Sequence, residues 1–258
     1  MQATTPMPSH AAAAASQPRP ANRRRVTDAP TRMFHWLFAL CFLGAYLTAD
    51  GESWRMLHVT LGYSMAGLLG FRVLYGVVGP RQAGLGLMWR KLGSAPAWLR
   101  SLRAAKSLSA VNWRQGQNLL MALAVVALLV LVVPLTLSGY ATFNEWGVFP
   151  GEDWLGEMHE FLGEAFLFVV LAHLALILGL SLLRRKNLAS PMLTGSVEGP
   201  GPGLVQKNRT WLAALLLLAV LAYGAWEWQQ SPNGLVSAKA LSSLMSGNGG
   251  GRDHGDDD

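Results

Sequence analysis

A long apolar segment that carries two histidines constrains the fold of this chain more than any other part of its sequence. Residues 154–183 are apolar enough, over a sufficient length, for one helix to cross a bilayer. His159 lies near the start of this segment and His173 lies in its middle. The interval is just under four helical turns, so both rings lie on nearly the same face, about 21 Å apart along the axis. Histidine is costly in such a segment and is by default a functional residue.

The composition of the chain also indicates a membrane protein. Of its 258 residues, 51% are hydrophobic and only 14% are charged, whereas soluble domains have about 25% charged residues. The single cysteine, Cys41, lies in the first apolar segment, where we expect ordinary apolar packing. One cysteine excludes an internal disulfide, and the sequence has no CxxCH site for a covalently attached haem. A cysteine-ligated iron–sulfur cluster is excluded for want of ligands.

Five apolar segments predict five membrane-spanning helices. The first begins with Asp28 as the N-cap and Pro30 in the first turn, and it ends at about Ala49. The third contains Pro134, which is tolerated near the end of a membrane helix. The second to fifth segments cover about residues 56–78, 118–139, 154–183 and 211–226.

The predicted fold is an all-α integral membrane protein with a four-helix bundle and a fifth C-terminal helix. Polar and Gly-rich composition indicates disordered tails at both ends of the chain. An interfacial helix is expected around residues 96–106 of the basic loop. The predicted divisions are a tail over 1–25, the bundle over 26–190, a Gly/Pro-rich basic linker over 191–210, the fifth helix over 211–228 and a tail over 229–258.

Lysine and arginine are concentrated in three segments that alternate with the spans. The N-terminal tail with Arg32, the loop 79–117 and the connector 184–210 together hold most of the 21 Lys and Arg residues. Because such residues favour the cytoplasmic side, we predict a membrane protein with a cytoplasmic N-terminus and a C-terminus on the outer side of the membrane. The net charge of +6 is then a signal of topology, and no nucleic-acid partner is expected.

Four of the six histidines lie in the spans, and the predicted topology sorts them into two pairs. His58 and His159 each lie near the start of a helix that enters from the outside. His35 lies early in a helix that enters from the cytoplasm, and His173 lies about 21 Å below His159. The other two histidines lie in the tails. The sequence therefore predicts an outer pair and an inner pair.

Two imidazoles that face each other across a helix bundle are the axial ligands of a six-coordinate haem. Gly62 and Gly163 each follow a histidine of the outer pair by one turn, where the missing side chain would leave room for the macrocycle. Both glycines could equally be helix-packing contacts. A lone membrane histidine is often an interhelical hydrogen-bonding residue. Zinc would require three or four ligands at one place, which two separate pairs do not supply.

Arg72 follows His58 by the same interval that separates His159 from His173, so it is predicted at the depth of the inner pair. The spans offer no carboxylate near this end to balance its charge, and an unpaired ion there is costly. We predict that Arg72 binds the propionates of an inner haem through a bidentate hydrogen bond. Extension of the side chain to the cytoplasmic interface is the alternative.

Three segments carry a family resemblance: RMFHWLF, MLHVTLGY followed by Arg72, and MHEFLGEAFLFVVLAH. They resemble the bacterial cytochrome b561 family, which includes the b-type cytochrome subunits of nickel–iron hydrogenases, over about residues 25–190. The resemblance implies electron exchange between quinones and a partner redox protein. The fifth helix and the acidic tail lie outside it, so no particular partner is implied. It also implies two b haems, with iron ligands His35, His58, His159 and His173.

Iron with two histidine ligands has no open position, which indicates electron transfer and not activation of a substrate. Expected partners are membrane lipid, quinone and a periplasmic redox protein such as a c-type cytochrome. The acidic, aromatic loop 144–157 would bind that protein, although its composition is also typical of an interfacial aromatic belt. A second hypothesis is a haem-carrying membrane-anchor subunit of a larger oxidoreductase such as a hydrogenase. A third is a metal-ion transporter, which would place acidic residues beside the histidines; the first three spans have none.

Overall fold

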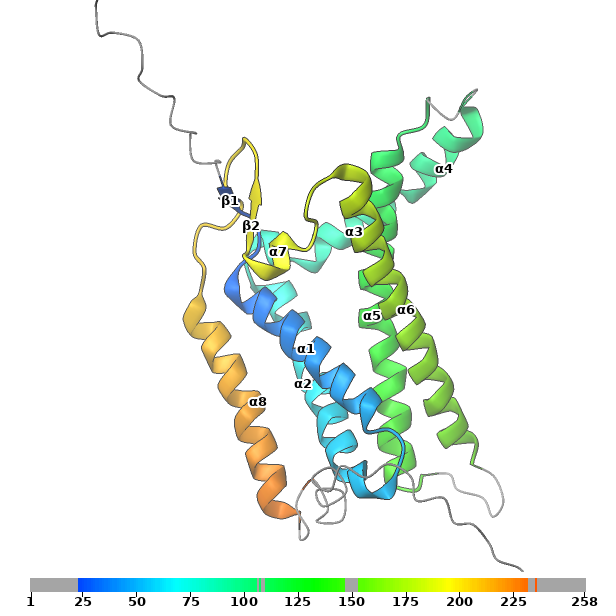
Figure 1. The fold of residues 1–258 in the computed structure, drawn as a ribbon, viewed down its shortest axis with the longest axis vertical. Coiled ribbons are helices and arrows are strands. Elements are labelled where there is room, and N and C mark those ends of the chain that lie inside the picture. The colour runs from blue at the N-terminus through cyan, green and yellow to red at the C-terminus, as the bar shows by residue number, and fades with distance from the viewer. Residues whose placement is uncertain (1–22, 106, 108–109, 147–152, 232–234, 236–258) are drawn as a thin grey trace, which may run out of the picture.

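Long helices make up almost all of this protein (Figure 1). The computed structural model describes residues 23–105, 107, 110–146, 153–231 and 235. The long helices of the described chain lie side by side along one direction, and they are α1 (Ala29–Leu47), α2 (Arg55–Val78), α5 (Trp113–Phe143), α6 (Trp154–Arg184) and α8 (Thr210–Gln230).

Four segments of the described chain are long and apolar enough to cross a membrane. They are Glu52–Val78, Trp113–Phe143, Trp154–Arg184 and Thr210–Gln230. Helix α1 has 19 residues and carries Arg32 and His35 near its start, and it is not among these four. The predicted all-α membrane class is therefore confirmed.

Helix α1 begins and ends where its local sequence dictates. The side chain of Asp28 accepts a hydrogen bond from the Thr31 backbone N–H at 3.2 Å, so the predicted N-cap is present. After Thr48 the chain turns through Gly51, whose φ of +108° is a conformation that residues with a side chain rarely adopt. Because this connector is short, α2 returns antiparallel against α1.

Helix α5 is longer than predicted at both ends. The Asn112 side chain accepts a hydrogen bond from the Gln115 N–H at 3.2 Å and caps the helix five residues before the expected start. The first turn is polar, which conceals this start in a hydropathy pattern. The helix continues through Pro134 to Phe143, because a membrane helix tolerates the one missing hydrogen bond.

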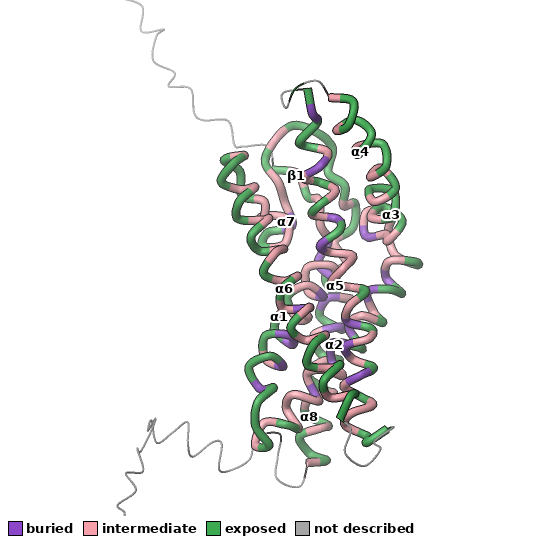
Figure 2. Tube along the Cα trace, turned by 90° about the vertical axis from the view of Figure 1, so that its right-hand side faces the viewer, coloured by how far each residue is buried: buried purple, intermediate pink, exposed green. Residues whose placement is uncertain are grey.

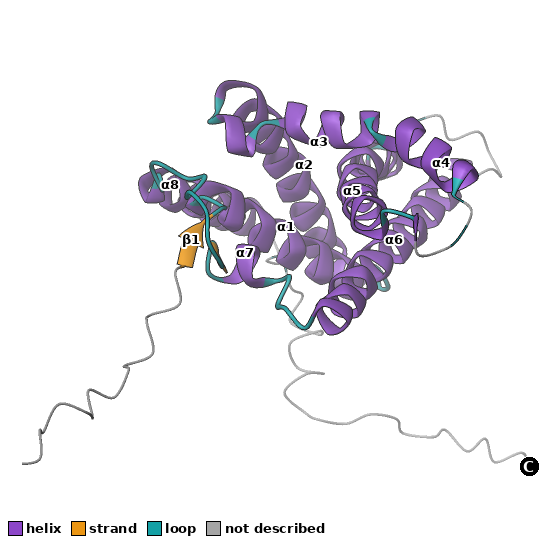
Figure 3. Cartoon of the chain, turned by 90° about the horizontal axis from the view of Figure 1, so that it is seen from above, coloured by secondary structure: helices purple, strands orange, loops and turns teal. Residues whose placement is uncertain are grey.

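The long helices pack as two pairs with α8 at one side. Helix α5 lies along α6, α1 lies along α2, and α2 contacts α5. Helix α8 lies against α1 on the side away from α5 and α6 (Figures 1 and 3). Buried residues are scattered among exposed ones along the long helices (Figure 2), as expected where lipid covers the outer surface. All five long helices contribute to the apolar core: Phe34, Cys41, Phe42, Met65, Leu68, Val132, Leu135, Phe166 and Leu216.

Short elements gather at the end of the bundle where α1 begins (Figure 1). The helix expected around residues 96–106 is α4 (Ala95–Ala104), and a further helix, α3 (Leu85–Gly93), precedes it. The described residues of all three basic segments lie at this end. The remaining short elements of the described chain are η1 (Glu52–Trp54), η2 (Arg81–Ala83), α7 (Ser190–Leu193), β1 (Arg23–Arg25) and β2 (Ser196–Glu198).

The last residues of the predicted N-terminal tail and the middle of the predicted linker are ordered together. Strand β1 pairs antiparallel with β2, with Arg23 opposite Glu198 and Arg25 opposite Ser196. The Trp36 indole N–H also donates to the Met192 carbonyl at 3.0 Å, which holds α7 on α1. Backbone hydrogen bonds make most of these contacts, and they do not depend on particular side chains. Neither segment therefore needs, or has, the alternation of apolar and polar residues that predicts a strand. The rest of both predicted tails lies outside the described residues, apart from Gln229–Ser231 and Leu235.

Candidate functional site

The structure brings the predicted outer histidines together. His58 on α2 and His159 on α6 have ring centroids 5.9 Å apart, with ring planes at 86°. A metal ion between two imidazoles, with metal–nitrogen bonds of about 2 Å, separates the ring centroids by about 6 Å. The observed separation therefore fits a metal held between these two rings.

Both outer histidines are oriented by backbone carbonyls. His58 Nδ1 lies 2.8 Å from the Ala45 carbonyl oxygen, and His159 Nδ1 lies 3.0 Å from the Leu135 carbonyl oxygen. A carbonyl only accepts, so each Nδ1 carries the proton and donates it. Each Nε2 then keeps a free lone pair, which is the usual arrangement of a metal-ligating histidine. The Ala45 carbonyl lies in the last turn of α1, where it also accepts from the Thr48 N–H at 3.2 Å and from the Thr48 hydroxyl at 3.3 Å.

The inner histidines also interact with each other, but their surroundings differ from those of the outer pair. His35 on α1 and His173 on α6 are half-buried and close enough to interact electrostatically. Nδ1 of each ring is buried and has no hydrogen-bond partner in the described structure. The inner imidazoles therefore lack the backbone hydrogen bonds that orient the outer pair.

Phe166 lies midway between the two histidines of α6, seven residues from each. Its side chain is only 1% exposed. Its ring centroid lies 4.7 Å from that of Phe42 and 6.3 Å from that of Phe38, both on α1. These rings join α1 to α6 and fill the space between the depths of the two histidine pairs.

The two glycines predicted beside a macrocycle face open space. A Cβ placed at Gly62 or Gly163 would meet no atom within 4 Å, which is consistent with room for a bound group. Gly70 and Gly179 are equally open, so this observation alone does not distinguish the predicted pair. The sequence did not reveal a closer contact at Gly139 of α5, where a Cβ would lie 2.8 Å from Cε1 of the His159 ring.

Arg72 is buried, with 4% exposure, and the structure supplies the carboxylate that the spans themselves lack. Asp28, which is 1% exposed, acts electrostatically on Arg72. It also accepts a hydrogen bond of 2.6 Å from the Tyr75 hydroxyl. The spans themselves hold no carboxylate near Arg72, as expected, but Asp28 lies just outside the apolar segment, folds against Tyr75 of α2 and acts on Arg72 from there. One guanidinium nitrogen, Nη1, still has no partner among the described residues.

Metal-binding side chains of the described residues do not cluster in threes. No group of three or more His, Cys, Asp or Glu side chains comes together there. The imidazoles meet only in pairs, which a haem needs and a protein-ligated zinc ion does not. The predicted docking loop 144–157 falls partly outside the described chain, since residues 147–152 are not described. At its edges, Trp146 and Trp154 are exposed.

Membrane-spanning helices with imidazoles facing each other between them define a class of protein, the membrane-bound b-type cytochromes. The family model described as prokaryotic cytochrome b561 matches residues 26–195, well over half of the chain. The protein therefore belongs to the prokaryotic cytochrome b561 family, as the resemblance predicts. No curated protein and no solved structure was found to match it. Membership implies binding of haem b and electron transfer in the membrane.

The contact at Gly139 gives a direct test of the site geometry. In Gly139→Val, new methyl groups would meet the His159 ring, and α5 and α6 are packed too closely to separate freely. We expect this variant to lose most of the haem that is predicted to lie between His58 and His159, measured as haem per chain. Gly224→Val on α8, where a Cβ meets nothing within 4 Å, is the matched control and should keep its haem. Unchanged haem content in both variants would show that the position of His159 against α5 is not required.

Proposed function

We propose that this protein holds two b haems and transfers electrons across the membrane between the quinone pool and a redox protein at the opposite face. One observation carries the proposal. His58 and His159 face each other at 5.9 Å with both Nδ1 atoms bonded to backbone carbonyls, and a second pair lies further along α6. A b haem, when bound, supplies one-electron chemistry, and two histidine ligands leave its iron no position for a substrate.

The protein's own residues would hold the two haems and keep them apart. His58 and His159 would bind the outer iron, and His35 and His173 the inner iron. Gly62 and Gly163 would leave room for the outer macrocycle, next to the ligands they follow. Phe166, packed against Phe42 and Phe38, would keep water out of the space between the sites. Electrostatic interactions are stronger in such a dry region, so local charges there would tune the potentials.

Arg72 is the proposed contact for the inner haem propionates. Its Nη1 atom is buried without a hydrogen-bond partner among the described residues, although Asp28 balances part of the charge. A guanidinium has five donors, so one side chain can face Asp28 and still donate to a propionate. The burial of Arg72 also argues against the alternative in which the side chain extends into water.

The proposed orientation places the end with α3, α4, α7 and the small sheet in the cytoplasm. The basic segments of the described chain lie at that end (Figure 1). Acidic residues dominate the other end, which includes Asp50, Glu52 and Glu157. With the five long helices all crossing the inner membrane, the N-terminus would be cytoplasmic and the C-terminus periplasmic. The His58–His159 site then lies near the periplasm.

The two sites are expected to differ in reduction potential. A hydrogen bond from Nδ1 to a carbonyl makes the imidazole a stronger electron donor and favours oxidised iron. Only the outer pair has such bonds, and the positive charge of Arg72 near the inner site favours reduced iron there. A spectroelectrochemical titration should show two steps, with the lower potential belonging to the haem that is lost on replacing His159. The opposite order would show that other charges dominate the potentials.

The decisive experiment is a visible spectrum of the purified protein with haem counted by the pyridine haemochrome method. We expect two b haems per chain, both reducible by a quinol in the purified protein. A haem-free protein would exclude electron transfer and favour a metal-ion transporter. Two haems with no reduction by quinol, in a protein that copurifies with a stoichiometric partner, would favour the anchor subunit of a larger oxidoreductase.

A further inference from the structure

A basic pocket lies where α3 meets the first turns of α5. It has a volume of about 340 Å³, and its charged lining residues are Lys91 and Arg114. Amides of Asn112, Gln115 and Asn118 supply further polar groups. The whole segment 79–117 contains no acidic residue, so nothing in it neutralises these cations.

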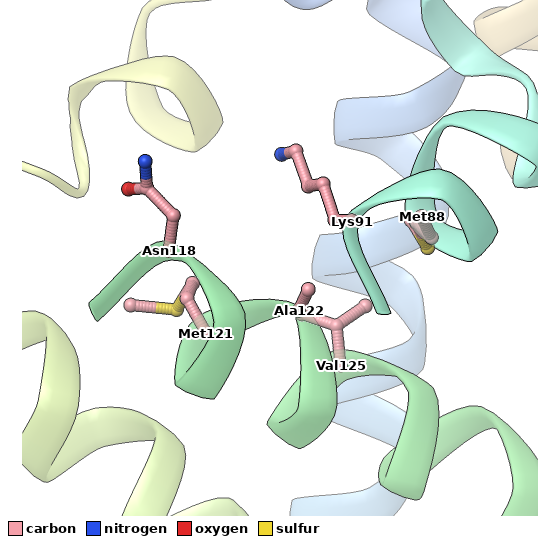
Figure 4. Close-up of a pocket in the computed structure, with 6 residues that line it drawn as sticks. All are labelled: Met88, Lys91, Asn118, Met121, Ala122 and Val125. Atoms are coloured by element: carbon pink, nitrogen blue, oxygen red, sulfur yellow. The ribbon is translucent and has the colours of Figure 1, made fainter. Parts of the chain in front are cut away.

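A second, apolar pocket continues from the first toward the membrane interior. The two pockets share Lys91 and Asn118. In Figure 4 these two side chains extend to the same side; Met121, Ala122 and Val125 lie along α5 below them, and Met88 lies on α3. From Asn118 to Val125 the helix advances about 10 Å. The apolar lining residues are Met88, Met121, Ala122 and Val125.

The pocket is held in place by the packing of α4 on α5. The Trp98 ring lies directly against Gly116, where an added Cβ would clash with the carbon atoms of the ring. The Trp98 indole N–H donates to the Asn112 carbonyl at 3.2 Å. On the outer side, Trp89 of α3 and Leu99 of α4 are exposed beside basic residues. An amphipathic pair of helices of this composition is typical of the lipid headgroup region.

We propose that this pocket binds one anionic phospholipid, with its phosphate between Lys91 and Arg114 and an acyl chain along the apolar strip of α5. The charge of the pocket selects an anion, and the apolar continuation selects an amphiphile over free phosphate. Basic pockets between helices at the membrane surface bind anionic headgroups in this way. The bound lipid would fill the space between α3 and α5 and fix the basic loop on the bundle.

The test compares lipids retained by the full-length protein from nanodiscs with equal amounts of phosphatidylglycerol and phosphatidylcholine. Native mass spectrometry then counts the lipids that remain bound on release. Each cation near an anionic headgroup contributes about a fivefold preference, so we expect roughly 30-fold enrichment of one phosphatidylglycerol. Lys91→Gln together with Arg114→Gln should remove both factors and leave almost no preference, and Lys91→Arg should keep the enrichment. Excess inorganic phosphate should not displace the lipid.

Arg100→Gln and Arg103→Gln on α4, outside the pocket, form the matched control and should retain the enrichment. Equal enrichment in the pocket variant and the control would overturn the proposal in favour of ordinary annular lipid. Displacement by inorganic phosphate would overturn it in favour of a simple anion site. Because these side chains are on the surface, helical content by circular dichroism should be unchanged in every variant.

Discussion

Replacing His159 with leucine is expected to reduce the haem content from two per chain to one. His58→Leu should remove the same haem, because the rings of His58 and His159 face each other at 5.9 Å. His35→Leu and His173→Leu should each remove the other haem. Six-coordinate iron that loses one of two protein ligands binds far more weakly, so we expect a loss of at least about 80% of that haem. Haem per chain and the surviving step in a redox titration would identify which haem each variant lacks.

Two controls separate ligation from a general loss of structure. His10→Leu lies in the predicted tail and should leave both haems in place. His159→Gly should regain its haem when imidazole is added, since the free ligand can occupy the space of the missing ring. If His35→Leu and His58→Leu removed the same redox component, the proposed pairing would be incorrect.

Much of this site could be predicted because a helix has a fixed rise. Once His58 and His159 are placed at one membrane face, the interval to His173 sets the depth of the second pair. The same reasoning placed the long helices, since an apolar segment of this length has few alternatives in a membrane. The depth of a residue in the membrane follows from the sequence and from the direction in which its helix crosses.

Contacts that depend on how one helix is rotated against another could not be predicted. Gly139 lies against the His159 ring only because α5 and α6 pack at that angle. The carbonyls of Leu135 and Ala45 orient the histidines, but every residue has a carbonyl, so no sequence pattern marks these two. The pairing of β1 with β2 was missed for the same reason, because it rests on backbone groups.

Asp28 was missed as a partner for a different reason. Its position before a helical segment predicts an N-cap, and the cap is present. A carboxylate has two oxygens, however: Oδ1 accepts from the Thr31 N–H, while Oδ2 accepts from the Tyr75 hydroxyl. A residue at the end of a span can therefore serve a neighbouring span, which a search for charges within the spans overlooks.

Arg72→Leu is expected to lower the reduction potential of the inner haem, or to abolish its binding. Loss of a positive charge disfavours the extra electron; a unit charge about 10 Å away, at an effective dielectric constant of about 20, contributes about 1.7 kcal/mol, or about 70 mV. Arg72→Lys should have a smaller effect, because it keeps the charge but not the planar pair of donors. Asp28→Asn should shift the potential in the opposite direction. The measurement is a redox titration of each variant, with the inner haem identified from His173→Leu.

Stability measurements distinguish a contact between Arg72 and the haem propionates from a role in which Arg72 only balances the charge of Asp28. Without Arg72, the buried Asp28 carboxylate keeps its hydrogen bonds to Tyr75 and Thr31 but loses a nearby positive charge, which lowers the stability of the fold. If Arg72 served Asp28 alone, Arg72→Leu would lower both the thermal stability and the inner potential, and adding Asp28→Asn, which rebalances the charge, would restore both. A contact with the propionates instead requires the inner potential or haem occupancy to stay low in the double variant, even where its stability is restored. Tyr75→Phe, which removes a hydrogen bond from Asp28 without changing the net charge, should move the potential least.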